Sequence, residues 1–191
     1  MRPRADRTRV PVVAATEASP RVESFPPQIG VECRVLVLGT VPSLASLALR
    51  QSYGHSQNLF WPFMGELFDA GPELDYAERI ARLHARGIGI WDVLERCERR
   101  GSLDSDIVVA SEVPNDIAGL LAREQTIVAI ALNGAKALQV FHRRIAPRID
   151  ADRMPQLLAL PSTSPANASL SRAHKFARWS ELLDWSKLTP G

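Results

Sequence analysis

The chain has 191 residues, 23 Lys and Arg against 21 Asp and Glu, a formal net charge of +2 and two cysteines. This length is expected to form one domain, and no apolar stretch of about 18 residues is present that could span a membrane. Two cysteines are too few for a disulfide scaffold or a four-cysteine metal site, so we expect no metal or other cofactor and a reducing, cytoplasmic environment.

Residues 1–30 contain five prolines, scattered arginines and no sustained hydrophobic period. Such a segment does not bury enough apolar surface to order itself. We therefore predict a flexible tail over 1–30 and a single domain over 31–188. An Arg-rich start with few acids is also compatible with a transit peptide.

Four short apolar runs predict buried parallel strands: Val35–Leu38, Ile88–Val93, Thr126–Leu132 and Leu157–Leu160. Helical spacing of apolar residues fills the intervals, around 76–83, 117–121, 137–145 and 176–183. Strands that alternate with helices favour a three-layer α/β/α sandwich around a central, mostly parallel sheet of about four strands. A binding site in such a sheet lies beyond the carboxyl ends of its strands.

The loop after the first predicted strand is long, polar and aromatic. It begins Gly39-Thr40-Val41-Pro42-Ser43 and continues through Tyr53-Gly54-His55-Ser56-Gln57-Asn58-Leu59-Phe60-Trp61. It lacks the glycines and the Lys-Ser/Thr pair of a phosphate-binding loop, which argues against nucleoside triphosphate hydrolysis. Aromatic faces beside amide and hydroxyl groups suit a nucleobase. For Phe60 and Trp61, packing of the following helix is an equally good explanation.

The loop after the last predicted strand reads Leu160-Pro161-Ser162-Thr163-Ser164-Pro165-Ala166-Asn167 and leads into a helix beginning near Leu170. Small hydroxyl residues at a helix N-terminus suit a phosphate oxygen, although Ser and Asn are also ordinary helix caps. Basic residues follow on that helix, and residues 133–191 carry nine basic side chains against four acidic ones. This cluster fits a polyanion, with a solvated charged face as the alternative.

Together these two loops resemble the two motifs of the uracil-DNA glycosylase superfamily, and most closely those of its hypoxanthine-DNA glycosylase (DNA-deoxyinosine glycosylase) branch. The resemblance extends from about Cys33 to Leu183 and includes intervening segments: Gly87–Val93, Gly101–Ser105, Asn115-Asp116 and Asn133–Ala137. It implies the same α/β/α fold. It also implies a monofunctional enzyme that flips a deaminated base, hypoxanthine first, out of double-stranded DNA and hydrolyses the N-glycosidic bond, leaving an abasic site.

The resemblance also implies roles for individual residues. The uracil and mismatch branches have Asp or Asn where this chain has Val41, and a valine can neither orient nor polarise a water, so their activity does not carry over through that position. In the hypoxanthine branch, the asparagine of the His-x-x-Asn-x-Phe-Trp segment, here Asn58, holds the catalytic role. Tyr53 falls where the superfamily stacks a ring on the flipped base.

Cleavage of a purine–sugar bond requires a positioned water and donors aimed at the departing base. We expect Asn58 to hold the water through its amide oxygen or to donate to the base. His55 is the second catalytic candidate, with a structural hydrogen bond as the alternative. Asp92, at a strand end, would assist as a base or hold a loop.

The remaining expectations concern binding and cellular context. The expected base-binding residues are Gly39, Thr40, Val41, Pro42, Ser43, Tyr53, Phe60 and Asn133. The expected DNA-binding residues are Ser162, Ser164, Pro165, Ala166, Asn167, Arg172 and Lys175. We expect a monomer in the cytoplasm, at the nucleoid in a prokaryote. Three alternatives stay open: a uracil or G:U/T mismatch glycosylase, a non-catalytic nucleotide- or DNA-binding module, and a small-molecule hydrolase.

Overall fold

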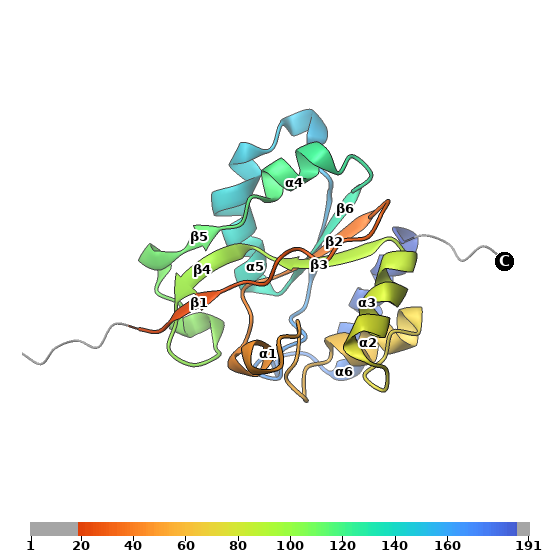
Figure 1. Cartoon of the computed structure of the whole chain (residues 1–191), viewed down its shortest axis with the longest axis horizontal. Coiled ribbons are helices and arrows are strands. Elements are labelled where there is room, and N and C mark those ends of the chain that lie inside the picture. The colour runs from red at the N-terminus through yellow and green to blue at the C-terminus, as the bar shows by residue number, and fades with distance from the viewer. Residues whose placement is uncertain (1–18, 187–191) are drawn as a thin grey trace, which may run out of the picture.

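The computed structural model describes residues 19–186, and a four-stranded parallel sheet lies at its centre (Figure 1). The strands are β2 (Val35–Gly39), β3 (Ile88–Asp92), β6 (Ala129–Asn133) and β7 (Gln156–Leu160), in the order β3-β2-β6-β7. All three neighbouring pairs run parallel. The four strands predicted from apolar runs are therefore confirmed.

The sheet separates two hydrophobic clusters, because successive side chains of a strand point to opposite faces. In β2, Leu36 and Leu38 pack into one cluster, whereas Val35 and Val37 pack into the other. Helices α4 (Ile117–Arg123) and α5 (Ala135–Val140) cover the first face, and helices α2 (Phe60–Phe68), α3 (Tyr76–Ala85) and α6 (Arg172–Trp179) cover the second (Figure 1). The predicted three-layer α/β/α sandwich is confirmed.

The helices predicted near 117 and 76 are present, and the other two have extensions of different pitch. Helix α5 continues as a π-helical turn over Phe141–Ile145, and α6 continues as a 3-10 turn over Ser180–Asp184. Ser171 caps α6 by accepting from the backbone N–H of His174. The other helical elements are α1 (Leu44–Leu49) and the 3-10 turns Asp104–Asp106, Val109–Ser111, Ala146–Arg148 and Ala151–Arg153. No helix between residues 19 and 186 is long and apolar enough to cross a bilayer.

A second sheet includes some of the described residues of the segment 1–30, which was predicted to be a flexible tail. Strand β1 (Arg21–Glu23) pairs antiparallel with β4 (Leu94–Glu98), which also pairs with β5 (Val113–Pro114). Farther along the chain, Gln28 forms an antiparallel bridge to Ile90 on the outer side of β3. Residues 21–28 thus form an edge strand of the second sheet and pair with the outer edge of the parallel sheet. Residues 1–18 of the expected tail and residues 187–188 of the expected domain lie outside the described part of the chain.

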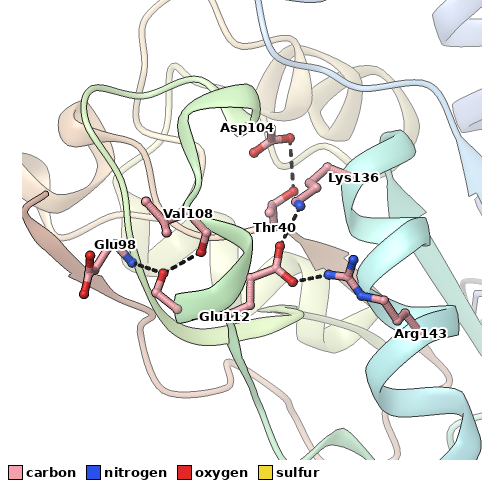
Figure 2. Close-up of polar contacts among 8 residues, drawn as sticks. Thr40, Glu98, Asp104, Val108, Glu112, Lys136 and Arg143 are labelled. Carbon is pink, nitrogen blue, oxygen red and sulfur yellow. Dashed lines mark hydrogen bonds and ion pairs between the residues drawn. The ribbon is translucent and has the colours of Figure 1, made fainter.

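Two buried charged side chains anchor the segment between β4 and β5. Arg99 is 2% exposed and donates from its guanidinium to the carbonyl of Pro42 at 2.6 Å. The carboxylate of Glu112 accepts from Lys136 Nζ at 2.6 Å and pairs with Arg143, both on the α5 segment (Figure 2). A buried carboxylate is tolerated when it is paired in this way. These contacts hold residues 99–112 against the ends of the parallel strands.

Gly134, between β6 and α5, is required by its backbone conformation and by its neighbour. Its φ of 98° and ψ of 164° lie in a region that is essentially restricted to glycine, and a Cβ there would lie 2.9 Å from the Cβ of Ser162. We predict that Gly134→Ala lowers the free energy of unfolding by about 1–3 kcal/mol, measured by urea denaturation.

The matched control is Gly101→Ala. Gly101 also has a positive φ, of 84°, but a Cβ there would approach only a carboxylate oxygen of Asp106, at 3.4 Å. We expect a smaller loss of stability for this variant. Equal losses for the two variants would contradict the importance of the Ser162 contact.

Candidate active site

A cleft of about 620 Å³ opens at the carboxyl edge of the parallel sheet. Its walls are the loops after β2, β6 and β7, together with Asp92 at the end of β3 and residues 102–105. Twelve of the residues expected to bind base or DNA, or to act in catalysis, line it: Gly39, Thr40, Val41, Pro42, Ser43, Tyr53, Asn58, Asn133, Ser162, Ser164, Ala166 and Asn167. The structure does not bring His55, Phe60, Pro165, Arg172 or Lys175 to this lining.

Tyr53 is held at the cleft by contacts around it. Its backbone has a φ of 57°, in the left-handed region, and the N–H of the next residue, Gly54, donates to Ser46 Oγ at 3.0 Å. Its ring stacks on Phe60 with ring centroids 3.9 Å apart and an interplanar angle of 23°. Phe60 is fully buried, so this residue packs behind Tyr53 and does not line the cleft as expected.

Asn58 lies at the start of α2 and lines the same cleft as Tyr53. Its Oδ1 accepts from the backbone N–H of Phe60 at 3.0 Å, and its own N–H donates to the carbonyl of His55 at 2.8 Å. The first contact engages one lone pair of Oδ1 and fixes the orientation of the carboxamide. The second lone pair and the two Nδ2 hydrogens are the groups with which this side chain can hold a water or bind a base.

His55 has a local structural contact. Its Nδ1 accepts from the backbone N–H of Gln57 at 3.1 Å, which assigns the proton of the neutral ring to Nε2. The imidazole thus stabilises the turn that precedes Asn58. This is the structural hydrogen bond that the sequence left open for His55.

Thr163 joins three segments of the site, and the sequence analysis did not single it out. Its Oγ1 accepts from Asn133 Nδ2 at 2.9 Å, and its N–H donates to Asn133 Oδ1 at 3.0 Å. Its carbonyl accepts from the N–H of Leu59, the residue after Asn58, at 3.0 Å. Both polar ends of Asn133, expected to bind the base, are therefore engaged in linking the loops after β6 and β7.

The last loop lines the cleft with hydroxyl groups, but its two expected basic residues have other partners. Lys175 is 3% exposed and donates to the carbonyl of Asn167, so it supports the loop from within instead of reaching a phosphate directly. Arg172 pairs with Glu66, and its guanidinium lies over the ring of Phe63, 5.4 Å from the centroid. Both residues thus have partners within the chain, and their contact with DNA stays a prediction.

Two carboxyl groups contribute to the electrostatics of the cleft. Burial and the neighbouring Asp104 raise the pKa of Asp92 to about 7, against the opposing effect of Arg99. Burial also raises the pKa of Asp104, whose Oδ2 accepts from the hydroxyl of Thr40 at 3.2 Å (Figure 2). Perturbed carboxyl groups of this kind are typical of functional sites. Because of these two carboxyl groups, the cleft differs from a DNA-binding groove that is lined by cationic side chains alone.

No physical signal in the sequence pointed to the wall formed by residues 102–105, or to Lys136 on the cleft lining. Gly101–Ser105 could be named only from the family resemblance, because a short polar segment has no hydrophobic periodicity from which its place in the fold could be predicted. Across residues 19–186, no group of three or more His, Cys, Asp or Glu side chains is arranged to hold a metal ion.

Comparisons with known proteins agree with this geometry. The family model of the uracil DNA glycosylase superfamily matches residues 26–185. A protein named hypoxanthine DNA glycosylase from Methanosarcina acetivorans is 33% identical over 114 residues, which cover 59% of this chain and 71% of that protein. Its namesake from Methanosarcina barkeri is 30% identical over 116 residues, covering 60% and 72%.

The fold of this chain is also similar to that of a solved structure. It is a solution NMR structure from Methanosarcina acetivorans, described as that of a candidate uracil DNA glycosylase. It superposes with a TM-score of 0.70 at 27% identity and covers 85% of this chain and 96% of its own. The match of the family model, the parallel sheet and the cleft at its carboxyl edge agree: the chain belongs to the uracil DNA glycosylase superfamily.

Proposed function

We propose that this DNA glycosylase removes hypoxanthine from double-stranded DNA by hydrolysing the N-glycosidic bond and leaving an abasic site. The observation that carries the proposal is the cleft in which Asn58, Tyr53 and the hydroxyl-rich last loop face a common space. The two Methanosarcina relatives named hypoxanthine DNA glycosylase support the choice of base. Val41, an apolar residue on the lining, favours this branch over one that needs a polar side chain there.

The chemistry follows from the position of each group. Base excision requires the nucleotide to leave the helix, and an aromatic face stabilises the flipped base by stacking. Tyr53 supplies that face, because its ring lines the cleft and is supported from behind by Phe60. The carboxamide of Asn58, oriented by Phe60 N–H, positions the water or the base for the attack on C1′.

The proposed function predicts a pattern of excision. The purified protein is incubated with labelled duplexes that contain hypoxanthine, uracil, xanthine or no lesion, and abasic sites are then cleaved with alkali. We expect cleavage at hypoxanthine and none in the undamaged duplex. Cleavage of no duplex would contradict the enzymatic reading and favour a binding module, whereas cleavage at uracil but not hypoxanthine would assign the protein to another branch.

Asn58→Ala is expected to slow excision of hypoxanthine by roughly 100–1,000-fold, because a preorganised polar group is lost from the transition state. It also removes the acceptor for Phe60 N–H at the start of α2, which costs about 1 kcal/mol of stability. Single-turnover kinetics measures the first effect and thermal unfolding the second.

The control for the helix start is Asn58→Asp, which keeps an oxygen acceptor but removes the amide donor. Retained excision by this variant indicates that the oxygen holds the water, and loss of excision indicates that the amide donates to the base. Nearly full activity of folded Asn58→Ala would contradict the catalytic assignment.

Ser164 is proposed to bind a phosphate beside the lesion, since it lines the cleft from the last loop. A phosphate contact carries no base information, so Ser164→Ala is expected to weaken binding of damaged and undamaged duplex by similar factors. Fluorescence anisotropy with both duplexes measures this, and Ser180→Ala, at the end of α6 and outside the lining, is the control. Selective loss of lesion binding would argue against a phosphate role.

A further inference from the structure

The cleft holds a carboxyl group that the role proposed for Asn58 leaves unused. Asp92, the last residue of β3, lies opposite Gly39 in the register of the sheet. A Cβ at Gly39 would lie 2.5 Å from Asp92 Oδ1 and 3.2 Å from Tyr53 Oη. The carboxyl group and the phenol thus converge beside the bare Cα of Gly39, on the lining of the cleft.

The phenol provides a second sign that a ligand atom belongs at this point. Tyr53 Oη is buried and makes no hydrogen bond of good geometry within residues 19–186, although the Asn133 side chain lies near enough to lower its pKa. A buried hydroxyl without a partner costs free energy, which a polar ligand atom in the cleft would recover. Asp92 and Tyr53 therefore form one polar pair facing the space that the flipped base would occupy.

The groups around Asp92 bring its titration close to neutral pH, so the protonated form is present there beside the carboxylate. Burial and the Asp104 carboxyl raise its pKa to about 7, and the Arg99 guanidinium opposes this. Burial raises the pKa of Tyr53, so the phenol stays neutral, and the positive charge of Lys136 lowers the pKa of Asp104 against the effect of burial. A general acid works best when its pKa lies near the pH at which the enzyme operates.

The other candidate donors at the site are less suited to this step. The Asn58 carboxamide has no proton that it can give up. Lys136 Nζ is bound to Glu112 at 2.6 Å, and His55 is not on the lining of the cleft. Asp92 combines a titrating proton with a place on the lining, next to the ring proposed to stack on the base.

We propose that Asp92 is a catalytic residue whose carboxylic acid donates its proton to N7 of the flipped purine as the C1′–N9 bond breaks. The inference rests on the proposed function. The bonding electrons of C1′–N9 pass to the base, and the proton gained at N7 makes the departing hypoxanthine neutral. Water forms the new bond to C1′, and the proton that it loses returns to the Asp92 carboxylate, so the residue is regenerated.

The test uses single-turnover excision from duplexes that contain either hypoxanthine or 7-deazahypoxanthine, which has carbon in place of N7. The wild-type rate on hypoxanthine is expected to fall as the pH rises above about 7, since the acid form of Asp92 is then lost. Asp92→Asn is expected to be roughly 100-fold slower or more, without that pH dependence. On 7-deazahypoxanthine the wild type is expected to be as slow as the variant.

Asp104→Asn is the matched control, because it keeps the acid but removes the neighbouring carboxylate. We expect it to shift the fall in rate to lower pH, since the pKa of Asp92 loses one of the effects that raise it. Asparagine has the shape of the neutral carboxyl group, so both variants are expected to fold, and thermal unfolding verifies this.

Three results would overturn the proposal: a wild-type rate that is constant across this pH range, Asp92→Asn with undiminished excision, or an equal loss in Asp92→Asn on the two substrates. In each of these cases the wild type still excises hypoxanthine, and the proposed function stands. A wild type that excises no hypoxanthine at any pH would instead contradict the proposed function, and the role of Asp92 with it.

Discussion

The hydrogen bonds of Thr163 hold the cleft together. This residue is 1% exposed and binds both polar ends of the Asn133 side chain, while its carbonyl accepts from Leu59 N–H. The parallel register brings the carboxyl ends of β6 and β7 to one edge, and Thr163 then couples that edge to the segment that carries Asn58. The loops need this coupling, because a loop without it would not hold a side chain at the precision that catalysis requires.

Many basic side chains of the last third of the chain form contacts within the protein and are not free to form a cationic surface. Six of the nine basic residues of 133–191 have partners within the chain: Lys136, Arg143, Arg153, Arg172, Lys175 and Arg178. We propose that contact with DNA depends on hydroxyls and backbone N–H groups of the last loop, which Lys175 supports through its hydrogen bond to the carbonyl of Asn167. Burial raises the pKa of both carboxyl groups in the cleft, Asp92 and Asp104.

The four central strands could be predicted because each is a short apolar run buried on both faces, and the position of the cleft followed from their parallel order. The antiparallel sheet could not: β1 and β5 have three and two residues, too few to show a period, and their pairing depends on β4. The roles of Asn58 and Tyr53 were predicted from the resemblance alone, and the structure places both residues on the lining of the cleft. The burial of Lys175 could not be predicted, because a basic residue on a helix is expected to be exposed unless the position of the neighbouring loop is known.

The reaction proposed for this protein is hydrolysis of a single N-glycosidic bond to hypoxanthine. Its most direct test is mass spectrometry of the products after reaction of a hypoxanthine-containing duplex in water labelled with oxygen-18. The account predicts free, unlabelled hypoxanthine and an unbroken strand that carries the label at C1′ of one abasic site. Release of no base, or a broken strand that still carries hypoxanthine, would contradict it.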